Sequence, residues 1–499
     1  MPRSVDPDFL ALPLDRLADV ALGVAASRGA THADFRVERL NNHVIVARDR
    51  ELQTSIETES VGFSVRVVCK GAWGFAAGID LTADAVAGVA RRAVEVAEAL
   101  APLNTEPVTL ADEPVYQDTY VSSYEIDPFT VPENEKIDFL LGLNDRTLGS
   151  TLVDRVTSHL LLVREQKYFA SLKGSRITQQ RVRVKGDLTA VRIDKSTGAF
   201  ETMGNAAPPV GRGWEYFTTG YDWLKDADEI PALLEQKMSS PSIKPGRYDI
   251  VVDPTNLWLT IHESIGHSTE LDRVLGYEAN YAGTSFATLD KLNTLQFGTP
   301  MMHVTGDRQV EHGLSTIGYD DEGVAAQTWD IIRDGVLVGY QLDRQMAHKQ
   351  RFGRSNGCAF ADQAGHVPLQ RMPNVSLSPS TKNITLRDLL SGMDEGLYIV
   401  GDKSWSIDMQ RYNFQFTGQK FFHVRGGKIV GQVKDVAYQS RTTDFWNSLE
   451  AVGGPATYVL GGAFNCGKGQ PGQIAPVTHG CPAALFRQVN ILNTAEEGN

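Results

Sequence analysis

The sequence predicts an α+β protein, in which an N-terminal half that mixes helices with antiparallel sheets precedes a β-rich C-terminal domain. Three observations support this prediction. Two amphipathic helical segments enclose a run of short strands within about the first hundred residues. Long alternations of apolar and polar residues follow in the middle of the chain, as in sheets with one solvated face. Beyond residue 246, short strands and turns predominate.

The first region, residues 1–110, is expected to form a small α+β domain. Residues 14–27 place apolar side chains on one helical stripe, and Gly29 is a typical helix stop. Residues 82–100 form a second such helix. Between the two helices, strands are predicted at residues 35–40, 43–47, 53–57, 61–67 and 71–75.

A middle α+β domain, residues 111–240, is predicted to follow. It contains helices at residues 133–144 and 227–238 and a long antiparallel strand within residues 177–193. The serine- and proline-rich segment 239–246 is the clearest linker in the chain, and we place the main domain boundary there.

The C-terminal region, residues 241–499, is expected to be a β-rich domain. It begins with a short apolar strand at residues 248–252. Further strands are predicted at residues 335–339, 397–400, 420–423 and 428–433.

Composition excludes several classes of protein. The net charge of −13 over 499 residues argues against nucleic-acid binding, because such proteins concentrate Lys and Arg. No apolar run approaches the ~18 residues that span a bilayer, so no membrane association is expected. The N-terminal residues lack the apolar core of a secretory signal, and a cytoplasmic location is expected. The four cysteines are too scattered for a disulfide framework: Cys69, Cys358, Cys466 and Cys481.

The most informative motif runs from His262 to His267 and has the sequence His-Glu-Ser-Ile-Gly-His. Two imidazoles flank a carboxylate, Glu263, at a spacing that allows one zinc ion and one general base to share a turn of backbone. Asp253 and Pro254 supply helix-start signals just upstream. The competing interpretation is an amphipathic helix with two hydrogen-bonded histidines.

The spacing of the two histidines requires a distorted helix. On an ideal helix, residues i and i+5 point about 140° apart, so His262 and His267 would not face the same ion. A bulge, a kink or a helix end between them would bring both to one side. Gly266 immediately precedes His267, and glycine tolerates such a distortion at low cost. We therefore expect an irregular turn at this motif.

A catalytic zinc takes three protein ligands and keeps one position for water, so a third ligand must come from elsewhere in the chain. The best candidate is Cys466, because its glycine-rich surroundings can approach another backbone closely. Lys468, two residues further on, is expected to favour the thiolate. The alternative interpretation is a glycine-rich turn with a small buried thiol.

Other candidates are weaker. Asp320–Gly323 is an acidic turn that could orient a ligand histidine, bind a substrate amine or face solvent. Residues 401–415 surround Ser404 and Arg411 with aromatic and amide side chains, which suit either a peptide groove or a half-buried strand. Four further candidate ligands fit ordinary core, surface or turn positions equally well: His303, His312, His479 and Cys481.

Several segments of the chain, which follow one another in the order expected for the family, resemble the TldD/PmbA family of zinc metallopeptidases, and its TldD branch in particular. The matching segments cover most of the chain, which makes the resemblance more specific than any single motif. They are residues 28–77, 262–267 with Glu270, 320–323, 335–340, 343–344 and 466–471.

The resemblance implies an α+β N-terminal half and a β-rich C-terminal domain that carries the metal site. It implies one zinc ion per chain, held by His262, His267 and Cys466, with Glu263 as the catalytic general base. It also implies a dimer, either a homodimer or a heterodimer with a metal-free paralogue, that encloses the active site in a chamber. Unfolded proteins or short peptides would enter this chamber and be hydrolysed with little sequence preference.

The chain departs from the family pattern in two places. The family is usually richer in glycine at Ser268-Thr269, and the segment His479-Gly480-Cys481 is an extension. Cys481 and His479 therefore stay open as alternative third ligands. Two rival functions also stay open, a zinc-dependent hydrolase of non-peptide amides and a non-catalytic partner subunit. Glu263 argues against the second, since a structural zinc site needs no general base.

Overall fold

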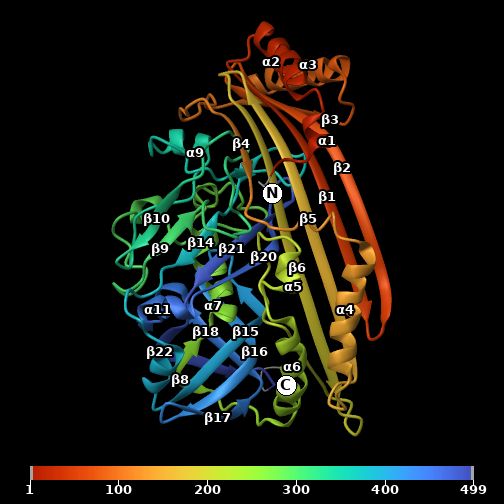
Figure 1. The fold of residues 1–499 in the computed structure, drawn as a ribbon. Coiled ribbons are helices and arrows are strands. Elements are labelled where there is room, and N and C mark those ends of the chain that lie inside the picture. The colour runs from red at the N-terminus through yellow and green to blue at the C-terminus, as the bar shows by residue number, and fades with distance from the viewer. Residues whose placement is uncertain (1–3, 496–499) are drawn as a thin grey trace.

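The structure is a computed structural model that describes residues 4–495, and it has the α+β architecture predicted from the sequence. Figure 1 shows a tall sheet from the N-terminal half of the chain standing beside a C-terminal half that is built of smaller sheets and short helices. The candidate site lies where the helix α7 (Pro254–Ile261) and the strand β20 (Val459–Lys468) meet, within the C-terminal half.

The tall sheet has seven strands in the order β3-β2-β1-β5-β6-β4, with β7 beside β6. β4 is parallel to β6, and the other neighbours are antiparallel. The strands expected at residues 35–40 and 43–47 are one continuous strand, because Asn41 does not end it but donates to Glu59 across the sheet. The bounds are β1 (His32–Arg48), β2 (Glu51–Cys69), β3 (Ala72–Gly78), β4 (Gln117–Val121), β5 (Arg155–Ser171), β6 (Arg176–Ile193) and β7 (Phe200–Gly204).

This one sheet contains strands from both regions expected to form separate domains. β1, β2 and β3 precede residue 110, whereas β5 and β6 follow it, and β1 pairs with β5 along its length. The division of the chain at residues 110 and 240 stays a prediction.

Two pairs of helices pack on the tall sheet. The helices α2 (Leu14–Ser27) and α3 (Ala83–Leu100) pack against each other and against β1, β2 and β3, as expected from their apolar stripes. The helices α4 (Glu133–Leu148) and α6 (Trp223–Ser239) contact each other and β6. α6 begins four residues earlier than expected because the Asp222 side chain caps it. The short helices are α1 (Pro7–Leu10), η1 (Ala101–Leu103) and α5 (Glu215–Thr218).

A second seven-stranded sheet forms the centre of the C-terminal half, in the order β15-β8-β22-β18-β16-β17 with β19 beside β22. β8 feeds directly into α7, which begins the histidine motif. The bounds in this sheet are β8 (Gly246–Val252), β15 (Glu395–Ile407), β16 (Asn413–Arg425), β17 (Lys428–Val433), β18 (Val436–Arg441), β19 (Leu449–Val452) and β22 (Ala484–Asn493).

Smaller elements complete the C-terminal half. A four-stranded sheet has the order β11-β10-β9-β14, and two-stranded sheets join β12 to β13 and β20 to β21. Their bounds are β9 (Val304–Asp307), β10 (Thr328–Arg333), β11 (Val336–Leu337), β12 (Ala359–Phe360), β13 (Leu369–Gln370), β14 (Asn374–Leu377) and β21 (Gln473–Cys481). The remaining helical segments are η2 (His262–Gly266), η3 (His267–Thr269), α8 (Leu271–Val274), η4 (Leu289–Lys291), α9 (Arg344–Lys349), α10 (Leu386–Ser391), α11 (Thr442–Asn447) and η5 (Pro455–Thr457).

The two halves of the chain meet through buried polar contacts. On β1, Arg36 donates to the backbone carbonyl of His366 at 2.7 Å, and on β5, Lys167 donates to Asp321 at 2.9 Å. The opposite face of β1 carries Phe35 and Val37, which belong to the apolar core under α2 and α3. The charged face of the tall sheet therefore fixes the C-terminal half in place, while its apolar face is covered by helices.

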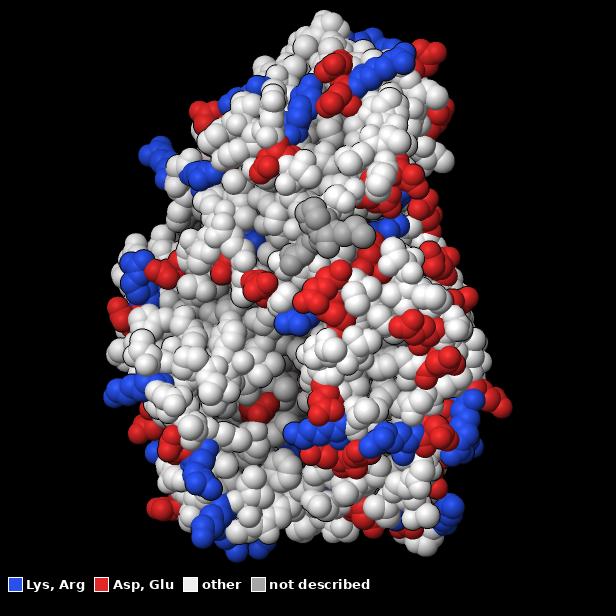
Figure 2. All heavy atoms as spheres, viewed as in Figure 1, with Lys and Arg blue, Asp and Glu red and all other residues white. Residues whose placement is uncertain are grey.

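The surface carries charges of both signs. On the face drawn in Figure 2, acidic and basic side chains are interspersed, and no continuous basic area crosses it. Among the residues that the structure describes, no helix is long and apolar enough to cross a membrane.

Candidate metal centre

The strand β8 and the helix α7 deliver the histidine motif to the interior. Asp253 caps α7 by accepting a backbone N–H bond, and Pro254 occupies the first helical position. The helix then continues as a π-turn, in which the N–H of His267 donates to the carbonyl of His262. Because a π-turn bonds residue i+5 to residue i, both imidazoles lie on one side, with ring centroids 4.6 Å apart. The irregular turn expected from the spacing is confirmed.

Gly266 has a different role from the one expected. Its dihedral angles, φ −52° and ψ −61°, are those of an ordinary right-handed helix, which any residue adopts. A Cβ atom at this position would lie 2.5 Å from Sδ of Met372. The absence of a side chain therefore permits the close approach of Met372, and the π-turn itself does not require glycine.

The strand β20 brings Cys466 to the two histidines. A bulge between Ala463 and Cys466 shifts the register of β20 against β21, and Sγ of Cys466 lies 3.5 Å from Nε2 of His267. One ligand atom from each of His262, His267 and Cys466 lies within 4.8 Å of the others, and all three side chains are buried. We call these three side chains the His-His-Cys cluster.

The charges around Cys466 favour its thiolate. Burial raises the pKa of the thiol, but His267 and Arg371 outweigh it, so that the pKa lies below its ordinary value. Arg371 also donates to the backbone carbonyl of Cys466 at 2.6 Å. Lys468, expected to favour the thiolate, is instead engaged by buried carboxylates, among them Glu270 at 3.1 Å. This ion pair fastens the end of β20 to the segment that follows the π-turn.

Each histidine of the cluster contacts a further buried residue through Nδ1. Nδ1 of His267 lies 2.8 Å from Oε2 of Glu270, and Nδ1 of His262 lies 2.8 Å from Nε2 of His479. Burial lowers the pKa of His262, and burial together with the neighbouring His262 lowers the pKa of His479 well below its ordinary value. With Nδ1 engaged in both rings, Nε2 is the nitrogen of each that remains to bind a metal ion; Nε2 of His267 faces Sγ of Cys466 at 3.5 Å.

The fold distinguishes between the candidate third ligands. His479 lies behind His262, on the side of Nδ1. Sγ of Cys481 contacts the carbonyl of Pro254 at 3.6 Å, and burial raises the pKa of this thiol well above its ordinary value. Only Cys466, among the described candidates, lies within reach of both His262 and His267.

Glu263 lies beside the His-His-Cys cluster and pairs with Arg411, whose Nη1 is 2.9 Å from Oε2 of Glu263. Burial raises the pKa of Glu263, but His267, His262 and Arg411 lower it more, so that its carboxylate is ionised near pH 7. Arg411 lies in the turn between β15 and β16 with a φ of 63°. This turn belongs to the aromatic and amide-rich segment that the sequence singled out.

A cleft of about 560 Å³ opens over the cluster. Its lining includes Lys185 and Asp187 of β6, residues 205–209, and Trp405 of β15. Residues 459–467 of β20 also line it. Within the described part of the chain, β20 pairs with β21 alone, so one edge of β20 has no partner strand. The cleft therefore combines the buried cluster with an open strand edge.

The other sequence candidates lie away from the cluster. In the acidic turn 320–323, Asp321 binds Lys167 and Glu322 binds Arg66. This turn joins the C-terminal half to the tall sheet and orients no cluster histidine. The two remaining candidate histidines, His303 and His312, pair with nearby surface carboxylates.

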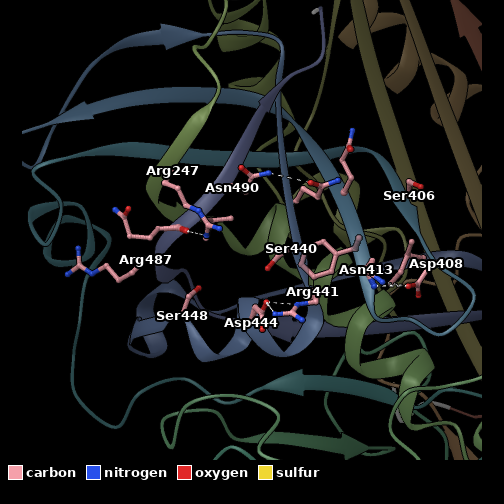
Figure 3. A pocket seen from close by; sticks show the side chains of 16 residues that line it. Arg247, Ser406, Asp408, Asn413, Ser440, Arg441, Asp444, Ser448, Arg487 and Asn490 are labelled. Atoms are coloured by element: carbon pink, nitrogen blue, oxygen red, sulfur yellow. Dashed lines mark hydrogen bonds and ion pairs between the residues drawn. The ribbon is translucent and has the colours of Figure 1, made fainter. Parts of the chain in front are cut away.

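A larger hollow, of about 860 Å³, lies over β15, β16, β18 and β22 (Figure 3). Its arginines are engaged. Arg441 binds Asp444, Arg487 binds Asp249, and Arg247 donates to a backbone carbonyl. Because these arginines are already engaged and no cluster residue lines the hollow, we assign it no chemistry.

Sequence reasoning missed three residues that shape the site: Arg371, Met372 and Val375. All three lie in or just before β14, which packs against the histidine motif and β21. No local pattern marks them, because they contact Cys466, Gly266 and His479, respectively, across about a hundred residues of chain.

Two family models and several curated proteins match this chain. The model of the PmbA/TldA metallopeptidase C-terminal domain matches residues 245–493, and the model of PmbA/TldA metallopeptidase domain 1 matches residues 33–97. A metalloprotease of Methanothermobacter thermautotrophicus is 26% identical, over 93% of this chain and 96% of its own. A zinc metalloprotease TldD homolog of Saccharolobus solfataricus is 22% identical, over 94% of this chain and 98% of its own.

A solved structure shows the same fold. The crystal structure of TldE from Thermococcus kodakarensis superposes with a TM-score of 0.68 at 14% sequence identity. The match covers 95% of this chain and 99% of that one. The arrangement of the tall sheet and the C-terminal half is therefore that of a known architecture.

Proposed function

This chain belongs to the TldD/PmbA family of metallopeptidases, and from that premise we propose that it is a zinc-dependent peptidase. The proposed reaction is the hydrolysis of peptide bonds in short peptides or unfolded proteins. The observation that carries the proposal is the buried cluster of His262, His267 and Cys466 beside the Glu263 carboxylate. The cleft gives a substrate access to all four side chains.

The donor set of the cluster suits zinc. Two neutral imidazoles and one thiolate are among the ligands that zinc prefers, and three protein ligands leave a fourth position for water. The lowered pKa of Cys466 favours the anionic form that binds metal. We propose one zinc ion per chain, held by Nε2 of His262, Nε2 of His267 and Sγ of Cys466.

In the proposed mechanism, Glu263 moves the protons. When bound, zinc supplies Lewis acidity that polarises the scissile carbonyl and makes water easier to deprotonate. The ionised carboxylate of Glu263 accepts a proton from the attacking water, whose oxygen bonds to the carbonyl carbon. Glu263 then gives this proton to the amide nitrogen as the C–N bond breaks, which releases an amine and a carboxylic acid.

The open edge of β20 supports a peptide, rather than a small amide, as the substrate. An extended peptide can add to such an edge through main-chain hydrogen bonds, which do not depend on its side chains. The cleft is lined by residues 459–467 of β20, so a peptide bound in the cleft would lie beside the main chain of this strand. This arrangement is consistent with cleavage that has little sequence preference.

The proposed working assembly is a dimer, either a homodimer or a heterodimer with a metal-free paralogue, as the family resemblance implies. In such a dimer the cleft of one chain would open into an enclosed chamber. A chamber would admit unfolded peptides and exclude folded proteins. A cytoplasmic location stays a prediction.

Metal analysis and peptide cleavage, measured together, test the proposal. We expect about one zinc ion per chain in the parent and in Glu263→Ala, and a loss of zinc in Cys466→Ser. Cys481→Ser is the matched control, because it changes a buried thiol outside the cluster. Glu263→Ala should lower peptide cleavage by at least about 10²-fold.

Three outcomes would contradict the proposal. A parent protein without zinc would exclude the metallopeptidase function. Cleavage at the parental rate by Glu263→Ala would exclude the proposed mechanism. If Glu263→Ala altered only stability, and the zinc-loaded parent cleaved no peptide, the chain would be a non-catalytic subunit.

A further inference from the structure

His479 is a fully buried imidazole for which the proposed reaction has no use. It lies on β21, and its ring stacks against Trp258 of α7 with an interplanar angle of 7°. Its Nε2 lies 2.8 Å from Nδ1 of His262, and its Nδ1 lies 2.8 Å from the backbone carbonyl of Val375. One end of the ring thus contacts the metal motif, and the other contacts β14.

These two contacts determine which nitrogens carry protons. A backbone carbonyl only accepts hydrogen bonds, so Nδ1 of His479 is the nitrogen that donates to Val375. In a neutral imidazole the other nitrogen is then an acceptor. Nε2 of His479 therefore accepts a hydrogen bond from Nδ1–H of His262, and Nε2 of His262 is left with a free lone pair.

The other tautomer of His262, with its proton on Nε2, would be unsuitable for metal binding. If His262 carried its proton on Nε2, that atom would point an N–H group at the place of the proposed zinc ion. The hydrogen bond that the second nitrogen makes sets the tautomer of a ligand histidine. For His267 the partner is the carboxylate of Glu270, whereas for His262 it is the ring of His479.

We propose that His479 is a positioning residue that holds His262 in the Nδ1–H tautomer, with Nε2 directed at the zinc ion. This inference rests on the proposed zinc site. A neutral partner behind His262 adds no negative charge to the site, unlike the carboxylate behind His267. Val375 and Trp258 hold the His479 ring in its orientation, so the hydrogen bond to His262 is preorganised before the metal binds.

The test compares three substitutions in the full-length protein. His479→Leu removes the acceptor at similar volume, His479→Gln keeps an acceptor on a chain of similar reach, and Cys481→Ala is the matched control. Cys481 is equally buried on the same strand but does not contact His262. Competition with a chromophoric chelator measures zinc affinity, and the spectrum of the cobalt-substituted protein reports the number of ligands.

We expect His479→Leu to bind zinc about 10- to 100-fold more weakly than the parent. His479→Gln should recover part of this loss, and Cys481→Ala should bind zinc as the parent does. The cobalt spectrum of His479→Leu should keep the geometry and the thiolate band of the parent. Unchanged zinc affinity in His479→Leu would overturn the proposal. A cobalt spectrum that shows the loss of one nitrogen ligand would also overturn it, since His479 would then be a ligand itself.

A second measurement applies even where His479→Leu does not fold. Nitrogen-15 NMR of the zinc-free parent, labelled at histidine, reports which nitrogen of His262 carries the proton, and His262→Ala assigns the signal. The proposal requires Nδ1–H, and finding Nε2–H would overturn it. Neither the zinc affinity nor the tautomer of His262 depends on turnover. A protein that binds zinc but cleaves no peptide would therefore contradict the proposed function and leave the role of His479 unaffected.

Discussion

At the scale of single residues, the proposed general base depends on Arg411. Its guanidinium lies 2.9 Å from the Glu263 carboxylate. Glu263 is buried, Arg411 is partly buried, and both line the cleft. The pair keeps the carboxylate ionised and restricts it to one position beside the His-His-Cys cluster. Because Arg411 contacts Glu263 and not a residue of the cluster, we infer that it positions the base and does not hold the metal.

Replacement of Arg411 by Ala is therefore expected to lower kcat for peptide cleavage by about 10²-fold, because the base loses its orientation. The zinc content should stay at the parental level. Arg411→Lys should recover part of kcat, since it keeps the charge without the planar fork. Steady-state kinetics that separate kcat from KM, together with metal analysis, provide the measurement. A rise in KM alone, or a loss of zinc, would contradict this role.

Residue type and spacing identified the members of the candidate site, but not their surroundings. The strings around His262 and Cys466 carry enough local chemistry to predict that both contribute to one cluster, and the structure brings them together. For Lys468 and Gly266, the nearest neighbours in sequence predict a role in thiolate stabilisation and in the helix distortion, respectively. The structure gives them others, because Glu270 engages Lys468 and Met372 packs on Gly266. Such contacts depend on tertiary packing that no local pattern encodes.

At the scale of elements, the π-turn is held by side chains of the η3 segment that follows it and by Trp446 of the helix α11. Ser268 and Thr269 donate to carbonyls one turn earlier, at Ser264 and Ile265. Trp446 donates to the Ser264 hydroxyl at 3.0 Å. The wider turn is thus fixed by hydrogen bonds, so that both cluster histidines are presented on one side before any ion binds.

Gly266→Ala tests how tightly this turn is packed. The added methyl group would meet the buried Met372, and we expect the free energy of unfolding to fall by about 1–3 kcal/mol. In a Met372→Ala background the same change should be neutral or slightly stabilising, because alanine is favoured over glycine at helical dihedral angles. Urea denaturation of the four proteins in this double-mutant cycle gives the coupling. Equal effects of Gly266→Ala in both backgrounds would show that the contact with Met372 is not the cause.

At the scale of the whole molecule, the sequence predicted element types better than their connections. The helices at residues 14–27 and 82–100 are confirmed, because their apolar stripes persist over several turns. The strands β1 and β2 are each longer than the short strands that the sequence predicts there. Polar residues such as Asn41 suggest a break, but within a sheet they pair with polar residues on the next strand. The joining of β1 to β5 brings together strands about 120 residues apart, and the sequence contains no local sign of it.

The contact between the two halves of the molecule contains one carboxylate in an unfavourable position. Glu38 on β1 is buried, and neither of its side-chain oxygens has a hydrogen-bond partner among the described residues. Burial raises the pKa of Glu38 to about 7, with Glu165 and Asp321 adding to the rise while Lys167 and Arg36 oppose it. The nearest cation, Lys167, is 3.8 Å away and lies closer to Asp321.

The raised pKa of Glu38 predicts how the free energy of unfolding depends on pH. The pKa of Glu38 is about 7 in the folded chain and about 4.5 in the unfolded chain. Below pH 4.5 the group is protonated in both states. As the pH rises from 4.5 to 7, the unfolded chain releases its proton first, so the free energy of unfolding falls, by up to about 3 kcal/mol. Glu38→Gln removes this titration and should be more stable than the parent at pH 7.5.

The difference in stability between Glu38→Gln and the parent should shrink as the pH falls toward 4.5, because the parent then carries a neutral acid at the same place. Urea denaturation between pH 4.5 and 7.5, at constant zinc occupancy, measures both curves. Glu51→Gln is the control, since Glu51 is an exposed carboxylate of the same sheet. Parallel curves for Glu38→Gln and the parent would mean that Glu38 is ionised in the folded chain. Lys167 would then stabilise the buried Glu38 carboxylate, and Glu38→Gln would be less stable than the parent at every pH.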